Sequence, residues 1–345
     1  LIQPETLKRL IATHISENAT ITLGSVEVER PEGYGRVIRT EDGKFVSKIV
    51  ESRDCSPEQA QINEINSGIY AIDSAFLKPA IDKLENKNVQ NEFYLTDIVA
   101  RASDEGQTVS AFTIPDHSEV QGVNTLYELA SVNTSLRVMR VRNLIDGGVF
   151  INDPDSLYVE SSVEVSPGAR IGPNVQLKGD TKIEKGVIIE GSALLINTHV
   201  QENAFIKLNV RAENSVIGKD SSVGPFANLR PGTVLKNKVK VGNFVETKNA
   251  TLSDNVSASH LSYLGDCSIG EKTNVGAGTI TCNYDGEKKH FTTIEENVFI
   301  GSNTAIVAPL KIGKDSTIGA GSVITKDVLE KSLALTRSSL ITKNN

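Results

Sequence analysis

The chain has 345 residues, a formal net charge of −7 and 23% charged side chains. This acidic balance argues against nucleic acid or an anionic membrane as the main partner, and no apolar run approaches the roughly 18 residues of a membrane span. The three cysteines, Cys55, Cys267 and Cys282, show no paired spacing. That spacing favours reduced thiols in a cytoplasmic protein over disulfides or a zinc site.

The first part of the chain, residues 1–124, predicts an α/β domain. Its hydrophobic periodicity and turn residues predict, in chain order, a helix over 4–13, a strand over 19–28, paired strands over 36–39 and 44–50, a strand over 64–72, a helix over 75–84, a helix over 93–105 and a strand over 110–114. No GxGxxG or Walker-type loop follows a leading strand. We therefore expect the second half of a Rossmann-like domain, with the first half absent from this chain.

Residues 125–146 predict a long helix that links this domain to the next. Leu126, Leu129, Leu136 and Met139 supply its apolar positions, and two glycines stop it at residue 147. The remaining region, residues 147–345, has a different organisation.

Aliphatic residues recur every six positions between Val159 and Val323. The repeat contains three unbroken series, namely Val159, Val165, Ile171, Leu177, Ile183 and Ile189; Ile217, Val223, Leu229, Leu235 and Val241; and Ile294, Ile300, Ile306, Ile312 and Ile318. A period of six fits neither an amphipathic helix nor two-residue alternation, and is typical of a parallel β-helix built from hexapeptides. Ile280 and Ile294 are fourteen residues apart instead of twelve, so we expect a loop over 283–291 to leave the coil.

Nine segments, in order, resemble one enzyme family. The first five are PEGYGR (31–36), IVE (49–51), EINSG (64–68), FYLTDI (93–98) and GVN (122–124), and the last four are GPFANLRPG (224–232), VGNFVETK (241–248), HLSYLG (260–265) and NVGAGTITCNYDG (274–286). They are similar to the bacterial bifunctional N-acetylglucosamine-1-phosphate uridylyltransferase and glucosamine-1-phosphate N-acetyltransferase. The family's opening phosphate loop and its magnesium-binding Asp have no counterpart here, so the resemblance implies a chain without the first part of the uridylyltransferase domain.

The resemblance implies two reactions and a fold. The acetyltransferase would pass an acetyl group from acetyl-CoA to glucosamine 1-phosphate. The uridylyltransferase would then join the product to UTP with Mg²⁺, giving UDP-N-acetylglucosamine for peptidoglycan and lipopolysaccharide synthesis. The implied fold is a left-handed parallel β-helix beside the α/β domain, in a cytoplasmic homotrimer whose sites are shared between chains. We expect the acetyltransferase to be intact and the uridylyltransferase incomplete.

The resemblance also assigns roles to individual residues. His260 would be the catalytic base, which suits an imidazole near neutral pH, with Glu246 orienting it. The expected ligands of the sugar phosphate are Arg230, Lys248, Tyr263, Asn274 and Lys289, and those of acetyl-CoA are Ala277, Asn283, Tyr284, Ser302, Ala320 and Arg337. The expected ligands of the UDP-sugar are Gly35, Glu51, Asn66 and Asn124, with Asn124 also the ligand of Mg²⁺.

Two alternatives remain open at this point. A non-catalytic, trimerising β-helix would keep the solenoid, but the retained His260, Arg230 and Lys248 argue against a decayed site. A monofunctional nucleotidyltransferase with a short β-helix would need the phosphate loop and the magnesium-binding Asp.

Overall fold

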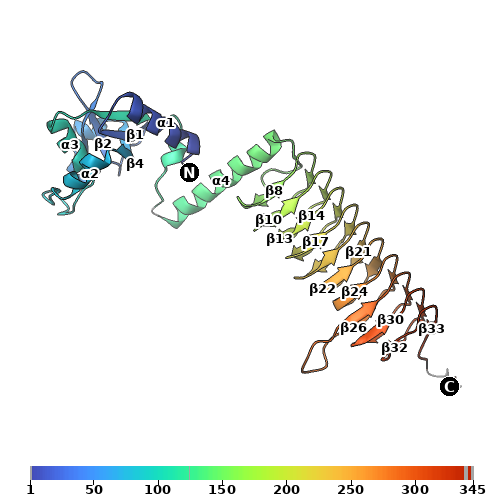
Figure 1. Cartoon of the computed structure of the whole chain (residues 1–345). Coiled ribbons are helices and arrows are strands. Elements are labelled where there is room, and N and C mark those ends of the chain that lie inside the picture. The colour runs from blue at the N-terminus through green and yellow to red at the C-terminus, as the bar shows by residue number, and fades with distance from the viewer. Residues whose placement is uncertain (1, 124, 338–340, 343–345) are drawn as a thin grey trace. The chain divides into compact units, whose positions relative to one another are not determined.

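The computed structural model describes residues 2–123, 125–337 and 341–342 (Figure 1). The chain divides into two compact units, Leu1–Asn133 and Thr134–Asn345, and helix α4 (Leu126–Asp146) contains the division. The domain limits expected at residues 124 and 146 remain a prediction. No helix in the described residues is both long and apolar enough to span a bilayer.

The first unit is built on a five-stranded mixed sheet in the order β3-β2-β4-β1-β5. Its elements are α1 (Pro4–Ser16), β1 (Ile21–Glu27), β2 (Arg36–Arg39), β3 (Val46–Val50), η1 (Ser52–Asp54), η2 (Gln59–Gln61), β4 (Glu64–Ile72), α2 (Ser74–Ile81), α3 (Asp97–Asp104), β5 (Val109–Thr113) and η3 (His117–Val120). Strands β1 and β5 are parallel, and the other neighbours are antiparallel. The elements expected from the sequence are confirmed, with differences in their bounds. Helix α2 ends at Ile81, three residues before the expected end, and α3 begins at Asp97 because residues 95–96 form a turn.

Two hydrophobic clusters cover the two faces of this sheet. Helices α2 and α3 contribute Ala80 and Ile98 to a cluster that contains Ile21 and Leu23 of β1. Helix α1 contributes Leu10 to a second cluster that includes Val26, Ile65 and Phe112. A register shift between Leu23 and Ser25 accompanies the change of face along β1.

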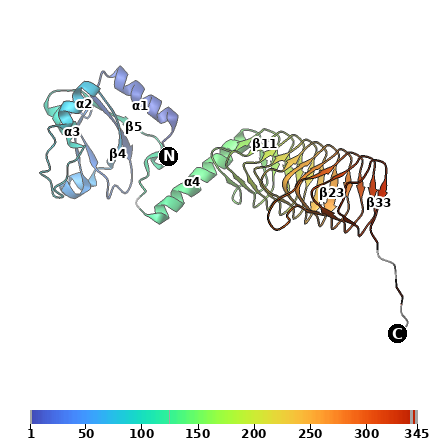
Figure 2. The same ribbon diagram turned by 60° about the horizontal axis from the view of Figure 1, so that its bottom comes forward.

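The second unit is a parallel β-helix with three columns of strands, which confirms the predicted architecture (Figures 1 and 2). Face 1 consists of β6 (Phe150–Ile151), β9 (Arg170–Ile171), β12 (Ile188–Ile189), β15 (Phe205–Ile206), β18 (Ser222–Val223), β21 (Lys240–Asn243), β23 (Ser257–His260), β25 (Asn274–Val275), β28 (Phe299–Ile300), β31 (Thr317–Ile318) and β33 (Leu333–Ala334). Every pairing along this face is parallel. The left-handedness of the coil stays a prediction.

Faces 2 and 3 share two long strands. Face 2 consists of β7 (Tyr158–Val159), β10 (Gln176–Lys178), β13 (Leu194–Ile196), β16 (Arg211–Glu213), β19 (Asn228–Leu229), β22 (Glu246–Leu252), β24 (Tyr263–Ile269), β26 (Ile280–Cys282), β29 (Ala305–Val307) and β32 (Val323–Ile324). Face 3 consists of β8 (Glu164–Val165), β11 (Lys182–Ile183), β14 (His199–Val200), β17 (Val216–Ile217), β20 (Val234–Leu235), the later parts of β22 and β24, β27 (Thr292–Ile294) and β30 (Leu310–Ile312). Strands β22 and β24 therefore run through the corner between the two faces.

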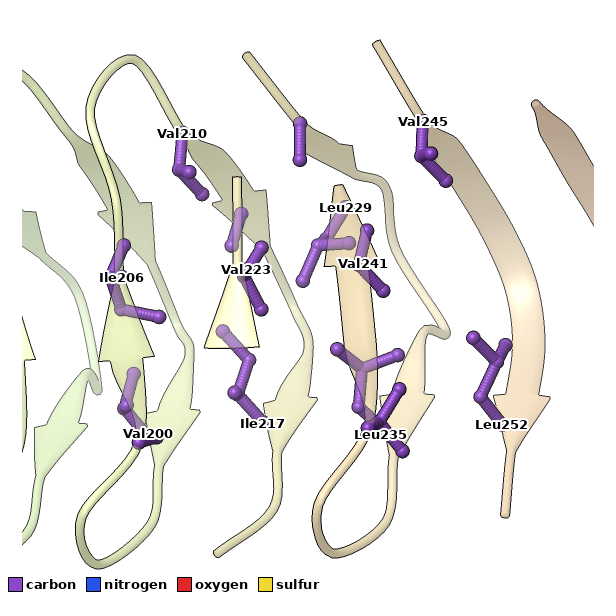
Figure 3. Packing of buried hydrophobic residues seen from close by; sticks show 14 of the residues in the cluster. Val200, Ile206, Val210, Ile217, Val223, Leu229, Leu235, Val241, Val245 and Leu252 are labelled. Atoms are coloured by element: carbon purple, nitrogen blue, oxygen red, sulfur yellow. The ribbon is translucent and has the colours of Figure 1, made fainter. Parts of the chain in front are cut away.

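The inward aliphatic residues form one core along the coils (Figure 3). Ile206, Val223 and Val241 are paired in register on successive coils and are at most 1% exposed. Stacking buries the apolar side chains that a single coil would leave exposed to water, so the stability of the solenoid depends on contacts between neighbouring coils. At the start of the solenoid, Val141 and Leu144 of α4 join this core.

The sixfold series is interrupted where successive inward residues on faces 2 and 3 are five positions apart instead of six. We call the segment between two such residues a five-residue turn. Leu195 and Val200 are consecutive inward residues on faces 2 and 3, as are Ala212 and Ile217, and both pairs are buried. The turns between them place Asn197 at φ 46° in the left-handed region, which asparagine adopts at low cost. Each five-residue turn shortens its coil by one residue, and the series of sixes then restarts.

Candidate functional site

Face 2 carries an ion pair at the position expected for the sugar-phosphate site. Arg230 follows β19, and Glu246 begins β22 on the next coil. Arg230 Nη1 donates to Glu246 Oε1 at 2.8 Å. The side chains are 43% and 38% exposed, so the pair lies at the surface. The hydrogen bond to Glu246 raises the pKa of Arg230 above its usual range, and one guanidinium nitrogen is fixed while the group stays charged.

Two lysines complete a group of cations on this face. Lys248 lies two residues after Glu246 on β22, and Lys289 approaches it from the loop over 283–291. The ammonium group of Lys289 lowers the pKa of Lys248, and Arg230 acts in the same direction, while Asp266 opposes them. We call Arg230, Lys248 and Lys289 the cation cluster. Like charges at close range repel each other, so the arrangement favours a bound dianion such as a phosphate monoester.

Tyr263 lies next to this cluster. It pairs with Glu246 across β22 and β24. Its hydroxyl lies above Gly265, where an added Cβ would come within 2.4 Å of the hydroxyl oxygen. The glycine therefore leaves room for the aromatic ring on the face that carries the cations.

His260 ends β23 at the corner between faces 1 and 2. Its side chain is exposed, and its backbone carbonyl accepts a hydrogen bond of 2.8 Å from the Ser262 hydroxyl. Within the part of the chain described by the structure, the imidazole has no hydrogen-bond partner, and Glu246 is bonded to Arg230 instead. The orienting role expected for Glu246 therefore stays a prediction, and an open imidazole is available to a substrate.

Three small residues expected to contact acetyl-CoA lie in one column with His260. The register of β23, β25, β28 and β31 aligns His260 with Ala277, Ser302 and Ala320 on the following coils. Asn303 N–H donates to the Ala277 carbonyl at 2.7 Å, and Gly321 N–H donates to the Ser302 carbonyl at 2.8 Å, which continues the column. The corner beyond His260 thus carries small side chains at Ala277, Ser302 and Ala320 on successive coils.

Asn274 lies apart from the other expected sugar-phosphate ligands. It begins β25 on face 1, between Ser257 and Phe299 in register, whereas Glu246 and Tyr263 belong to face 2. A single chain therefore does not bring Asn274 beside the cation cluster. The sequence motif alone gave no indication of this, because hexapeptide spacing does not say which face a residue occupies.

The loop over 283–291 leaves the corner between faces 2 and 3 and contains a short hairpin (Figure 1). Asn283 at its root is 7% exposed, whereas Tyr284 is 60% exposed and its hydroxyl donates to the Gly286 carbonyl. Asp285 accepts bonds from two backbone N–H groups and from His290 Nε2, which together lower the pKa of its carboxyl. The loop is therefore held by its own hydrogen bonds, and the insertion expected from the fourteen-residue spacing is confirmed.

Arg337 follows the last coil. Its guanidinium lies near Gly319, with Nη2 3.7 Å from the position of an added Cβ there. Gly319 precedes Ala320, so Arg337 lies at the far end of the strip of small residues that starts at His260.

The first unit brings together three of the four residues expected to bind the UDP-sugar. Asn66 N–H donates to the Gly35 carbonyl at 2.8 Å, and a Cβ on Gly35 would lie 3.4 Å from the Glu51 carboxylate. Thr96 donates to Glu51 at 2.9 Å, a contact that sequence reasoning missed although Thr96 belongs to the FYLTDI segment. Asn124 lies outside the described residues.

The magnesium site expected from the sequence depends on Asn124, which lies outside the described residues. They contain no group of three or more His, Cys, Asp or Glu side chains that could hold a metal ion.

Comparisons with known proteins agree with this division of the chain. Family models match residues 1–131 ("Nucleotidyl transferase"), residues 154–245 ("GMPPB C-terminal domain") and residues 291–326 ("Bacterial transferase hexapeptide (six repeats)"). Because the first match extends over residues 1–131, it gives no support to the expectation that the first part of this domain is absent. A nucleotidyl transferase domain joined to a hexapeptide β-helix defines the chain as a transferase with two different domains.

The relatives identify the family. The chain is 45% identical to "Bifunctional protein GlmU" of Pelobacter propionicus, with 98% of this chain and 73% of the relative covered. It is 46% identical to the protein of that name from Geotalea daltonii, with 99% and 75% covered. The chain belongs to the bifunctional GlmU family. Among solved structures, an Arabidopsis UDP-N-acetylglucosamine acyltransferase matches at a TM-score of 0.36 and 17% identity over 54% of this chain and 70% of that chain, which carries no functional argument.

Proposed function

We propose that the β-helix transfers an acetyl group from acetyl-CoA to the amine of glucosamine 1-phosphate. The cation cluster on face 2 supports this most strongly, because Lys248 lies close to two further cations, Lys289 and Arg230, and the nearby anions, Glu246 and Asp266, are fewer than the cations. A sugar phosphate would supply the missing negative charge, and Tyr263 lies beside the cluster to contact the sugar. The strip from His260 to Ala320 is suited to the thioester arm of the donor.

These positions support the following course of the transfer. The amine attacks the thioester carbonyl carbon, and a C–N bond forms while the carbonyl carbon becomes tetrahedral. His260 takes the proton that the amine loses, and a neutral imidazole suits this task near pH 7. Collapse of the intermediate breaks the C–S bond, and the departing thiolate takes up a proton to give free CoA. Arg230, Lys248 and Lys289 hold the phosphate throughout, which fixes the amine relative to His260.

Release of free thiol tests this reaction. The chain should release CoA with glucosamine 1-phosphate and not with glucose 1-phosphate, which has a hydroxyl in place of the amine. Equal release with both sugars, or none with either, would contradict the proposal.

We further propose that three copies of the chain assemble with parallel solenoid axes. Large apolar residues recur on successive coils at the corner that carries His260, where Leu208, Phe226, Phe244 and Leu261 are 41%, 48%, 58% and 63% exposed. Phe226 and Phe244 stack with ring centroids 5.4 Å apart, and both have φ near 55° in the left-handed region, which is costly for such residues. We call these four residues the apolar corner.

The position of Asn274 also supports the assembly. Since Asn274 lies on a different face from the cation cluster, it can join the proposed site only as a residue of a neighbouring chain. The apolar corner lies next to His260, so a contact between corners would bring a neighbour's face 1 toward face 2. Threefold assembly would thus complete the sugar-phosphate site.

The family supports a second reaction, in which uridylyl transfer from UTP with Mg²⁺ yields UDP-N-acetylglucosamine and pyrophosphate. Gly35, Glu51 and Asn66, which lie together, are proposed to contact the sugar nucleotide. We propose that these 345 residues alone do not complete this step, because their sequence contains no Gly-rich phosphate loop. Both reactions are proposed to take place in the cytoplasm.

A further inference from the structure

A buried carboxylate, Asp266, lies close to the cation cluster of the proposed acetyl-transfer site. Asp266 is 8% exposed and is the one carboxylate among the buried side chains of residues 2–123, 125–337 and 341–342. Its two oxygens are held by carboxamides on the coils before and after it. Asn249 Nδ2 donates to Oδ1 at 2.7 Å, and Asn283 Nδ2 donates to Oδ2. We call Asn249, Asp266 and Asn283 the corner ladder.

The turn itself does not require a charge at this place. Asn197 and Asn214 occupy the same corner on earlier coils, with φ of 46° and 44°, and Asn197 Nδ2 donates to Asn214 Oδ1 at 3.1 Å. Asn249 and Asp266 have similar φ values of 44° and 46°. A neutral ladder is therefore compatible with the backbone, and a buried charge carries a desolvation cost that neutral asparagine avoids.

A carboxylate differs from a carboxamide in two ways that matter here. It has only acceptors, so it accepts a charge-assisted bond from each neighbour at once, whereas an asparagine would accept from one neighbour and donate to the other in weaker neutral bonds. It also places a negative charge beside the cation cluster. Lys248 pairs with Gly265, the residue before Asp266, and Asp266 raises the pKa of Lys248 against the opposite effect of Lys289 and Arg230.

Asn283, the third member of the corner ladder, lies at the root of the loop that carries Lys289. Asn283 is buried, and its backbone carbonyl accepts a bond of 2.8 Å from His290 N–H at the other end of the loop. Fixing the side chain of Asn283 therefore fixes where the loop leaves the solenoid. Asp266 is in this way connected to two members of the cation cluster, to Lys248 by charge and to Lys289 through the loop.

We propose that Asp266 is a positioning residue of the acetyl-transfer site, which holds the loop over 283–291 at its root and maintains the cation cluster beneath the substrate phosphate. The inference rests on the proposed acetyl transfer for its functional part. Its structural part, the hold on the loop, can be measured without any substrate.

The first experiment measures the loop. In Asp266→Asn, the two charge-assisted bonds to the carboxylate are replaced by weaker bonds between neutral carboxamides, so the root opens more often. Tryptic cleavage after Lys288 and Lys289, followed by mass spectrometry of the native protein, should be about tenfold faster than in the wild type, the effect of losing a charged hydrogen bond. Asn214→Ala, in the neutral part of the same corner, should leave the cleavage rate unchanged.

A charge-swapped variant distinguishes the loss of hydrogen bonds in the corner ladder from a general destabilisation of the fold. Asp266→Asn combined with Asn283→Asp restores a charge-assisted bond to the root of the loop and keeps the net charge, with the carboxylate one coil further along. Cleavage in the loop should return to within about threefold of the wild-type rate. Should Asp266→Asn not fold, a folded swap variant with a protected loop supports the proposal. Wild-type cleavage in Asp266→Asn, or an unprotected loop in the swap, overturns it.

The second experiment measures the cation cluster through the KM for glucosamine 1-phosphate as a function of pH. The charged groups that face Lys248 are Lys289, Arg230 and Asp266. Loss of the Asp266 charge lets Lys248 lose its proton at lower pH, so the alkaline rise in KM should move to lower pH in Asp266→Asn. A profile that superimposes on the wild type would overturn the role in the cluster. Absence of thiol release by the wild type would instead contradict the proposed acetyl transfer. The tryptic cleavage rates would still test whether Asp266 holds the loop at its root.

Discussion

Arg230 and Glu246 meet across adjacent coils of face 2, with the guanidinium Nη1 2.8 Å from the carboxylate oxygen. A second arginine pair, Arg211 with Glu213 at 2.7 Å, lies on the preceding coil of the same face and is similarly exposed. The two pairs differ in their surroundings, because only Arg230 belongs to the cation cluster. They therefore form a natural comparison between an ion pair in the proposed site and one outside it.

The first prediction uses this comparison. Arg230→Ala should raise the KM for glucosamine 1-phosphate at least about tenfold, since a charge-assisted bond to phosphate is lost. Arg211→Ala should change it less than about twofold, because exposed ion pairs contribute little. Steady-state kinetics with both variants check this, and equal effects would remove Arg230 from the phosphate site.

The second prediction concerns the proton. His260→Ala should lower kcat by about 10²–10⁴ while the KM for glucosamine 1-phosphate changes little, because the cations that hold the phosphate remain. His199→Ala is the matched control, since its imidazole pairs with Glu184 at 2.7 Å on face 3 and should not affect turnover. If His260→Ala keeps more than about a third of the wild-type kcat, another group deprotonates the amine.

The sequence named candidate residues for the site, but it did not indicate on which face of the β-helix each of them lies. The inward aliphatic residues were predictable because their period is set by the coil itself, and so was the loop over 283–291. The placement of Asn274 on face 1 was not predictable, because a hexapeptide looks the same on every face. The burial of Asp266 was also missed, since five-residue turns break the period there and hydrogen bonds between coils leave no pattern in the sequence.

The third prediction follows from the pKa of Lys248, which Lys289 lowers below the ordinary value of 10.5. As the pH rises through this lowered pKa, Lys248 loses its charge and the KM for glucosamine 1-phosphate should increase. Lys289→Gln removes the neighbour that lowers the pKa, so the increase should move to higher pH although the KM is larger at every pH. Lys288→Gln, which changes the adjacent residue of the loop, should leave the position of the increase unchanged in the same pH series.

The fourth prediction concerns the stability of the solenoid. Leu235 is fully buried, so Leu235→Ala should lower the free energy of unfolding by about 2–5 kcal/mol. Val234, the preceding residue, points outward and is only half-buried, and Val234→Ala should cost less than about 1 kcal/mol. Denaturant unfolding of both variants measures the difference, and similar losses would argue against the inward row as the source of stability.

The fifth prediction concerns assembly. Phe226→Asp combined with Phe244→Asp places two like charges on the apolar corner, and light scattering should show monomers in place of trimers. Val89→Asp changes an exposed apolar residue of the first unit, 71% exposed, and should leave the mass unchanged. Acetyltransferase activity should fall together with the trimer, because Asn274 would no longer reach a neighbouring site. A wild-type monomer with full activity would contradict the assembly.

The most direct measurement of the central claim follows both products in one reaction. The wild-type chain of 345 residues, its mass verified, is incubated with acetyl-CoA, glucosamine 1-phosphate, UTP and Mg²⁺. We predict stoichiometric free CoA and N-acetylglucosamine 1-phosphate, with no pyrophosphate above the level of a blank without protein. Omitting Mg²⁺ and UTP should leave the acetyl transfer unchanged. Failure to acetylate the amine would contradict the proposed β-helix activity, and sustained release of pyrophosphate would contradict the proposal that these residues alone do not complete uridylyl transfer.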